Sequence, residues 1–334
     1  MTEAAINTFI DKYVKEHLSP TQDEKDDISA KYAVVCDVLG GTCFQAGSYA
    51  RFTAIHPVHD LDIIYVVNDP TIKQDPLKYM RELCVKLEKA GLPDIEDLTV
   101  QTHSVTITFK LKGDVHFSID IVPALELPER NHPYGDPLYE VPEILKMNKR
   151  HREQRYSKAV GNPIGWVKTD PRGYISAATD LNDANSSFRH ATKFGKGWRH
   201  ACKVEFDENY RFKSFHFEQM FFKYFTDNPG ATTLEAITYC FGWIPSALNK
   251  PQFPDRADQA VFIDEYVNSL TPKEKGLIVK LQAEAHALVV KIPGVQNETE
   301  LKILLEKILD VTKPSTRHTA SNMVVAQTRQ PWAY

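Results

Sequence analysis

The stretch GSYARFTAIHPVHDLDIIYVV, residues 47–67, decides the fold. A glycine-serine pair, Gly47-Ser48, lies a short way ahead of two aspartates, Asp60 and Asp62, which run directly into an apolar segment. That segment predicts a strand over 61–67. Successive strand side chains point to opposite faces, so the two aspartates share one face while the apolar residues beside them point into the core. Two carboxylates on one face are costly to desolvate unless a cation compensates them.

A third acid strengthens this interpretation. The segment HFSIDIVP, residues 116–123, sets Asp120 between two isoleucines in an otherwise apolar strand. If the two strands are neighbours, Asp60, Asp62 and Asp120 converge. Hard oxygen ligands of this kind suit Mg2+ or Mn2+ better than zinc, and three carboxylates can hold two metal ions roughly 4 Å apart. The turn at Gly47-Ser48 would let backbone N–H groups and a hydroxyl approach phosphate oxygens closely. The pattern therefore indicates metal-dependent chemistry on a phosphate.

Composition limits the other possibilities. The chain has 334 residues, 42% of them hydrophobic and 25% charged, with a formal net charge of -4. These values are typical of a globular protein with a large core and argue against a surface built throughout to hold nucleic acid. The first residues predict an amphipathic helix rather than a signal peptide, and no apolar run is long enough to span a membrane, so we expect a cytoplasmic protein. The five cysteines are scattered and never occur at CxxC spacing, which favours free thiols over disulfides or zinc.

The two halves of the chain differ in their predicted secondary structure. Up to about residue 128 the pattern predicts mixed α and β structure, with helices over 1–17, 23–39 and 76–90 and strands over 61–67, 104–111 and 116–122. From residue 185 onward it predicts helices only, over 185–204, 213–226, 232–241, 257–269, 273–291 and 298–311, with N-caps at Asn185, Thr271 and Asn297. A region rich in proline and glycine separates the halves. The basic run 146–152 in this region is interpreted as a solvated helix face rather than a phosphate grip, and 313–334 as a tail or a strap over the surface.

The order of these motifs resembles a known superfamily. A Gly-Ser pair, an Asp-x-Asp that opens a strand and a single Asp in a later strand are similar to the polymerase-beta-like nucleotidyltransferases. The segments GSYARFTAIHPVHDLDIIYVV, SVTITF and FSIDIVPA resemble one branch of them, the bacterial oligonucleotide or dinucleotide second-messenger synthases (CD-NTases) of anti-phage signalling, which are relatives of animal cyclic GMP-AMP synthase and oligoadenylate synthase. This resemblance implies an α+β nucleotidyltransferase core over 1–168 and a helical, oligoadenylate-synthase-like domain over 169–334.

The resemblance continues into the helical half. In this family a lysine on one helix and a serine that opens a later helix hold the triphosphate, and the aromatic residue after the serine stacks on a base. The segments KFGKGWR, 193–199, and KSFHFE, 213–218, resemble these two sites. The resemblance therefore implies nucleotide-binding roles for Lys196, Ser214 and Phe215, with Lys193 as the alternative lysine. The segment WVKTDP, 166–171, resembles the crossing between the two domains.

The implied activity is the joining of ribonucleoside triphosphates into a cyclic di- or trinucleotide, with two Mg2+ ions, or Mn2+ in their place, held by Asp60, Asp62 and Asp120. The product would activate an anti-phage effector. We expect a monomer. The animal relatives that sense nucleic acid carry a Cys/His zinc insertion in the helical half, where only Cys202 and Cys240 are available here. We therefore expect no requirement for a DNA or RNA activator. Three alternatives stay open: a nucleotidyltransferase that acts on tRNA or protein, a non-catalytic nucleotide-binding regulator, and a nucleic-acid sensor. Histidines His56 and His59 are interpreted as loop residues without a metal role.

Overall fold

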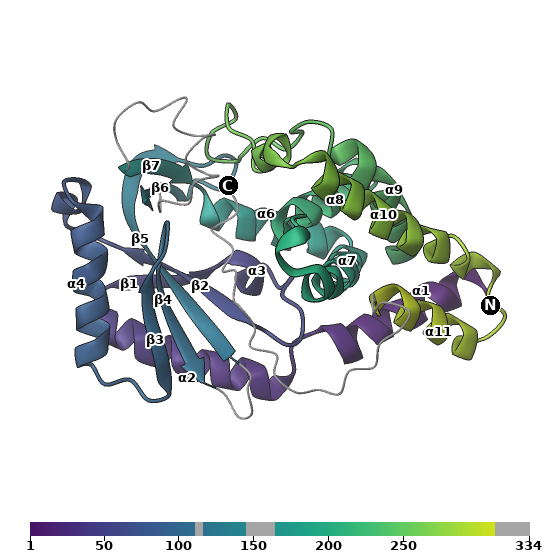
Figure 1. Cartoon of the computed structure of the whole chain (residues 1–334), viewed down its shortest axis with the longest axis horizontal. Coiled ribbons are helices and arrows are strands. Elements are labelled where there is room, and N and C mark those ends of the chain that lie inside the picture. The colour runs from purple at the N-terminus through teal and green to yellow at the C-terminus, as the bar shows by residue number, and fades with distance from the viewer. Residues whose placement is uncertain (111–115, 145–163, 311–334) are drawn as a thin grey trace. The chain divides into compact units, whose positions relative to one another are not determined.

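The computed structural model describes residues 1–110, 116–144 and 164–310 (Figure 1). Contacts divide the chain into two compact units. Of the described residues, one unit contains those within 20–180 and Pro254–Val261, and the other contains Met1–Ser19, Leu181–Phe253 and residues 262–310. The first is called the sheet unit and the second the helical unit. Among the described residues, no helix combines the length and the apolar character that crossing a membrane requires.

A mixed sheet forms the centre of the sheet unit. Its main path has the order β1-β2-β5-β4-β3, with β6 paired to the end of β5 and β7 paired to β6 (Figure 1). The strands are β1 (Thr42–Ala46), β2 (Asp60–Val66), β3 (Ile95–Val100), β4 (Val105–Lys110), β5 (His116–Arg130), β6 (Pro137–Ile144) and β7 (Ile164–Thr169). The pair β2 and β5 is parallel, whereas the other pairs are antiparallel. This mixed sheet confirms the predicted α+β fold class.

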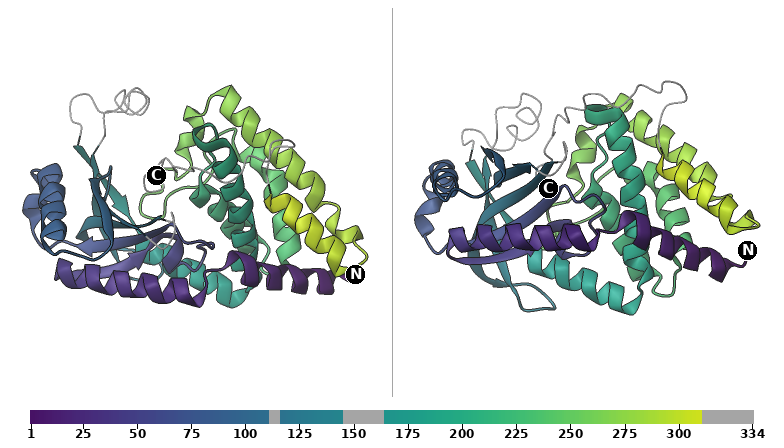
Figure 2. Two further views of the ribbon diagram at one scale, coloured as in Figure 1. Left: turned by 60° about the horizontal axis from the view of Figure 1, so that its bottom comes forward. Right: turned by 90° about the horizontal axis from the view of Figure 1, so that it is seen from below.

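Two helices cover one face of this sheet. They are α2 (Gln22–Leu39) and α4 (Pro76–Lys89), and α2, drawn in purple, runs along the strands in both views of Figure 2. The core between helices and sheet is apolar throughout, with Ile28, Val35 and Leu39 from α2, Met80, Leu83 and Leu87 from α4, and Leu61, Ile63, Ile107, Ile119 and Ile121 from the strands. A capping box begins α2, since Thr21 and Glu24 satisfy each other's backbone N–H groups. The short α3 (Gly47–Ala50) and α6 (Pro171–Ala184) complete the unit's main helices.

The helical unit is built on aromatic packing. Its described helices are α1 (Glu3–Tyr13), α7 (Ser187–Phe206), α8 (Ser214–Asp227), α9 (Thr233–Ala247), α10 (Pro272–Val289) and α11 (Glu298–Leu309), with a π-helical turn over Val14–Leu18. Trp198 of α7 packs on Phe217 of α8 and Phe241 of α9, with ring centroids 5.9 and 4.9 Å away, and all three side chains are buried. Large aromatic side chains bury much apolar surface, so this cluster fixes the three helices together.

One predicted helix differs from the structure. The predicted helix over 257–269 is wrong: this segment forms turns and only a short 3-10 helix, Glu265–Ser269. Aspartates at its start and just ahead of it accept from nearby backbone amides instead: Asp258 accepts from Ala260 N at 3.0 Å, and Asp255 accepts from Ala257 N at 2.7 Å. Such local side-chain bonds compete with helix formation. The contacts group Met1–Ser19 with the helical unit. The basic run 146–152 and the tail 313–334 lie outside the described residues.

Candidate active site

The three predicted acids lie on one face of two neighbouring strands. In the parallel pair of β2 and β5, Asp62 stands opposite Asp120 and Asp60 stands opposite Ser118. Leu61 and Ile63 point to the opposite face, into the core beneath α2 and α4. Because paired residues of adjacent strands project to the same side, all three carboxylates emerge on the side away from that core. Asp60 is exposed, and Asp62 and Asp120 are half-buried.

Two buried hydroxyls, one on β4 and one just ahead of it, contact Asp120. Thr106 stands opposite Asp120 in the antiparallel pair of β4 and β5, and its Oγ1 donates to Asp120 Oδ1. Ser104 Oγ lies 3.5 Å from the same oxygen. Both hydroxyl residues are buried, at 0% and 2% exposure. A buried hydrogen bond to a carboxylate orients it, so β4 holds Asp120 in place. Sequence analysis gave no role to these residues, although the alternation of Ser104, Thr106 and Thr108 with apolar residues indicates a polar strand face.

The Gly-Ser turn touches the acids. Gly47 has a φ of +64°, and a Cβ added there would lie 1.6 Å from Asp62 Oδ2 and 2.6 Å from Asp62 Cγ. Only glycine fits both the left-handed backbone and this close approach. Ser48 is half-buried, and its carbonyl accepts from Thr53 N at 2.9 Å and Ala54 N at 3.1 Å. The turn and the Asp-x-Asp pair therefore lie next to each other in the structure, as the sequence predicts.

The histidines near the acids make protein contacts. His56 Nδ1 lies 2.8 Å from Glu24 Oε2 of α2, and Glu24 Oε1 accepts from Val58 N at 3.1 Å. Burial raises the pKa of the Glu24 carboxyl, but the hydrogen bonds from His56, Thr21 and Val58 together lower that pKa below its ordinary value. The His59 carbonyl accepts from Ser118 N at 2.9 Å. These contacts attach the loop ahead of Asp60 to α2 and β5.

The donor set fits a hard divalent cation. Across the described ranges, no three Asp, Glu, His or Cys side chains already stand in a metal-binding arrangement. The register nevertheless sets Asp62 directly opposite Asp120, with Asp60 two residues along the same face. Carboxylate oxygens from adjacent strands are ligands that Mg2+ and Mn2+ prefer. Asp60, Asp62 and Asp120 are therefore the residues that would hold such an ion.

In the helical unit, Lys196 forms a buried ion pair. Its Nζ lies 3.2 Å from Glu218 Oε2 of α8, and the two side chains are 6% and 1% exposed. Lys196 is therefore not a plain surface lysine. The glycines on either side have packing roles: a Cβ on Gly195 would lie 2.5 Å from Phe221, and one on Gly197 would lie 3.2 Å from Leu18 and Leu309. The alternative lysine, Lys193, donates from Nζ to Ser19 Oγ at 3.0 Å.

Ser214 and Phe215 open α8, as the sequence predicts. Ser214 is the first helical residue and lies one turn before Glu218, so the partner of Lys196 is on the same side of α8 as Ser214. Both Ser214 and Phe215 are half-buried, whereas Phe217 is fully buried. The helix start is fixed by Tyr266, whose hydroxyl accepts from Lys213 N at 3.0 Å. Lys196 and Ser214 thus lie near the same end of α8.

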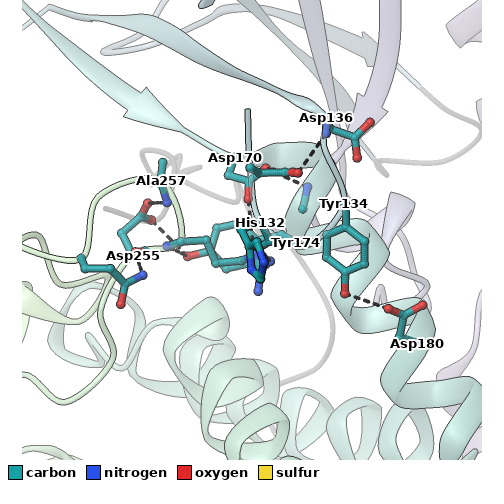
Figure 3. Close-up of polar contacts among 12 residues, drawn as sticks. His132, Tyr134, Asp136, Asp170, Tyr174, Asp180, Asp255 and Ala257 are labelled. Atoms are coloured by element: carbon teal, nitrogen blue, oxygen red, sulfur yellow. Dashed lines mark hydrogen bonds and ion pairs between the residues drawn. The ribbon is translucent and has the colours of Figure 1, made fainter. Parts of the chain in front are cut away.

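A polar network at the start of α6 joins distant segments of the sheet unit (Figure 3). Asp170, 1% exposed, accepts from Asn131 Nδ2 at 2.7 Å and from Gly173 N at 2.8 Å. Arg256 Nε lies 3.4 Å from the other oxygen of the same carboxylate. Tyr174 OH donates to Asp255 Oδ2 at 3.1 Å. The Asp-Pro pair of the predicted domain crossing therefore caps α6 and ties residues 131–136 and 254–261 to it, which makes this network structural.

The fold is that of the polymerase-beta-like nucleotidyltransferases, and comparisons with known proteins agree. Residues 5–140 match the Second Messenger Oligonucleotide or Dinucleotide Synthetase domain, SMODS. Residues 5–140 are thus similar to this domain, which confirms the resemblance drawn from the sequence. A search of curated protein sequences found no match.

Several solved structures share the fold. The Escherichia coli MS115-1 CdnC structure in complex with HORMA-deltaN has a TM-score of 0.66 and 17% identity, over 91% of this chain and 97% of that one. Vibrio cholerae DncV, a cyclic AMP-GMP synthase, has a TM-score of 0.65 and 10% identity, over 93% and 98%. Bradyrhizobium diazoefficiens CdnG, solved in complex with GTP, has a TM-score of 0.56 and 12% identity, over 91% and 99%. The resemblance in fold thus extends over both units.

Proposed function

We propose that this chain joins ribonucleoside triphosphates into a cyclic di- or trinucleotide second messenger and releases pyrophosphate. The observation that carries the proposal is the register of β2 and β5, which sets Asp62 opposite Asp120 with Asp60 on the same face. The contact of Gly47 with the Asp62 carboxylate supports it, because a phosphate-binding turn belongs beside the metal ligands. The match of residues 5–140 to the second-messenger synthetase domain supports this reaction class.

Each residue has a proposed role. Asp60, Asp62 and Asp120 hold Mg2+, with Mn2+ as a substitute, as a pair of ions. Bound Mg2+ would supply neutralisation of the triphosphate charge and a lower pKa for the attacking ribose hydroxyl. Thr106 holds Asp120 Oδ1, which fixes the direction of Oδ2, the atom that we assign to accepting the hydroxyl proton. The ribose oxygen attacks the α-phosphorus of the donor, and pyrophosphate leaves.

The remaining roles concern orientation of the nucleotides. Ser48 and the amides of its turn hold donor phosphate oxygens. Lys196, or Lys193 in its place, and Ser214 hold the triphosphate from the helical unit, while Phe215 stacks on a base. The half-buried positions of Ser214 and Phe215 at the start of α8 leave part of each side chain accessible to a nucleotide. Catalysis then comes mainly from position and charge neutralisation.

We further propose that the product acts on an anti-phage effector in the cytoplasm, and that the enzyme is a monomer that needs no DNA or RNA. The family supports the first part, since its members make second messengers. Nuclease treatment of the purified enzyme tests the second part. Full activity after treatment supports it, and activity that returns only when DNA or RNA is added overturns it.

Pyrophosphate release tests the proposed reaction. The wild type, Asp60→Asn/Asp62→Asn and Asp120→Asn are incubated with the four ribonucleoside triphosphates and Mg2+, and thermal unfolding is measured for each. Asp37→Asn is the matched control, because Asp37 is exposed on α2. The proposal predicts release by the wild type and the control only, with similar unfolding temperatures. Normal release by a folded Asp120→Asn variant would refute the assignment of that carboxylate.

A further inference from the structure

Arg172 is held from two sides within the sheet unit. It is the second residue of α6, and its guanidinium carbon Cζ lies 4.0 Å from the centroid of the Phe44 ring of β1. Its Nε donates to the Tyr139 hydroxyl of β6 at 3.2 Å. Tyr139 is buried and lies beside Phe44, with ring centroids 5.6 Å apart. A guanidinium that is stacked on a ring and bonded through Nε has a fixed plane, so its two terminal nitrogens have a fixed direction.

The terminal nitrogens of this guanidinium have hydrogen-bonding capacity left for a ligand. Across residues 1–110, 116–144 and 164–310, no carboxylate forms an ion pair with Arg172, and its Nη1 and Nη2 donate no hydrogen bond to the protein. The side chain is half-buried, so water reaches only part of it. An arginine keeps its charge at physiological pH, and a charge that is partly withdrawn from water is stabilised by an anion beside it. The arrangement therefore favours an anionic ligand.

The strand register locates this arginine relative to the candidate active site. In the antiparallel pair of β1 and β2, Ala46 stands opposite Asp62, and Phe44 is two residues before Ala46. Residues two apart on a strand project to the same face and are separated by about 7 Å, so Phe44 lies on the face that carries the Asp62 carboxylate. Cys43, the residue before Phe44, packs against the opposite face, in the core beneath α2 and α4. Arg172, which stacks on Phe44, therefore lies over the same face of the sheet as the three acids.

The chemistry of the guanidinium indicates the ligand. Its planar fork presents N–H groups that match two oxygens of one phosphate, and such charge-assisted bonds are strong. A triphosphate bound through Mg2+ at Asp62 would bring several phosphate oxygens to this face. We propose that Arg172 binds a phosphate of the ribonucleoside triphosphate substrate, with Phe44 and Tyr139 as the residues that position it. This inference deepens the proposed function and rests on it for the identity of the substrate.

Three substitutions of Arg172 separate a phosphate contact from a structural one. Arg172→Gln and Arg172→Met remove the charge: glutamine can still form hydrogen bonds, and methionine can still pack its stem on Phe44. Arg172→Lys keeps the charge without the fork. Arg81→Gln is the matched control, because Arg81 is exposed on α4, the helix that covers the opposite face of the sheet. Titration calorimetry measures binding of tripolyphosphate and of a non-hydrolysable ATP analogue, each with Mg2+, and scanning calorimetry measures thermal unfolding.

Loss of the charge should weaken both ligands alike. Arg172→Gln and Arg172→Met should each weaken binding of tripolyphosphate and of the ATP analogue about tenfold or more, as expected for a lost hydrogen bond between charged groups. Arg172→Lys should recover part of the loss, and Arg81→Gln should stay within about twofold of the wild type. A folded variant without the charge that binds both ligands normally would overturn the proposal. An equal loss in Arg172→Lys would overturn it as well, because the fixed stacking rather than the charge would then matter.

The remaining outcomes are also decisive. A loss for the ATP analogue alone would contradict the proposal, since the contact would then be to the base or the ribose. Failure of both charge-removing variants to fold would assign Arg172 to the structure of the sheet unit, against the proposal, and so would a wild type that binds neither ligand. Binding does not require turnover. A wild type that binds both ligands but releases no pyrophosphate would therefore count against the proposed function, while the Arg172 variants would still decide the phosphate contact.

Discussion

The hydrogen bond from Thr106 to Asp120 allows the sharpest test of how the site is held. Thr106→Val replaces the donating hydroxyl with a methyl group of similar size at a position that is 0% exposed. A hydrogen bond to a charged group contributes about 1.5 to 3 kcal/mol. Ser104, at 3.5 Å from the same oxygen, is too far to replace it fully. If all of this free energy serves to orient the Asp120 carboxylate for the reaction, Thr106→Val should lower turnover roughly 10- to 150-fold.

The assay measures kcat and the Mg2+ concentration for half-maximal rate, together with thermal unfolding. Thr106→Ser should restore most of the rate because it keeps the hydroxyl. Thr99→Val is a matched control, since Thr99 donates to a different carboxylate, Asp97 Oδ2, at 2.6 Å on neighbouring β3. This control should keep normal turnover. A folded Thr106→Val enzyme with the kcat of the wild type would refute the positioning role of Thr106.

Three further perturbations follow from the structure. Gly47→Ala should lower turnover at least about 100-fold, because its Cβ would displace the Asp62 carboxylate from 1.6 Å away; a normal rate in steady-state kinetics would contradict this contact. Lys196→Met should lower the free energy of unfolding by about 3 to 5 kcal/mol in urea denaturation, since it removes the cation 3.2 Å from the buried Glu218 carboxylate, and Lys196→Met/Glu218→Leu should recover most of the loss; a change below about 1 kcal/mol would argue against the ion pair. Burial lowers the pKa of His216 to about 3, so the unfolded chain takes up a proton below its ordinary pKa of 6.5 while the folded chain does not. Between about pH 7 and about pH 5, the free energy of unfolding should therefore fall by about 2 kcal/mol more for the wild type than for His216→Gln. If the free energies of unfolding of the two proteins depend equally on pH, His216 is protonated in the folded chain.

Much of the sheet unit could be predicted from local patterns. Strands β2, β4 and β5 have continuous or alternating apolar residues, and helices α2 and α4 have apolar residues at helical spacing. Strands β1, β3, β6 and β7 were not predicted. Prolines at 137, 142 and 163 make the segments of β6 and β7 resemble loops, yet pairing with β5 and with each other stabilises them as strands. Tertiary pairing overrides local preference there.

For the candidate site too, the sequence predicts the individual residues but not the contacts that depend on tertiary packing. The Asp-x-Asp spacing and the lone Asp120 could be recognised in the sequence, because a period of two assigns strand side chains to faces. The pairing of Asp62 with Asp120 depends on the parallel register of β2 and β5, which local spacing does not determine. The ion pair of Lys196 with Glu218 joins residues 22 positions apart on two helices. Such a contact depends on how α7 packs on α8, where Gly195 permits close approach to Phe221.

Identification of the product tests the central claim most directly. The purified protein is incubated with all four ribonucleoside triphosphates and Mg2+, treated with phosphatase, and its products are identified by mass spectrometry beside those of Asp60→Asn/Asp62→Asn. The account predicts a phosphatase-resistant cyclic di- or trinucleotide that is formed by the wild type and absent from the variant. Nucleotides transferred only to added tRNA or to protein, or the same cyclic product from the variant, would contradict it.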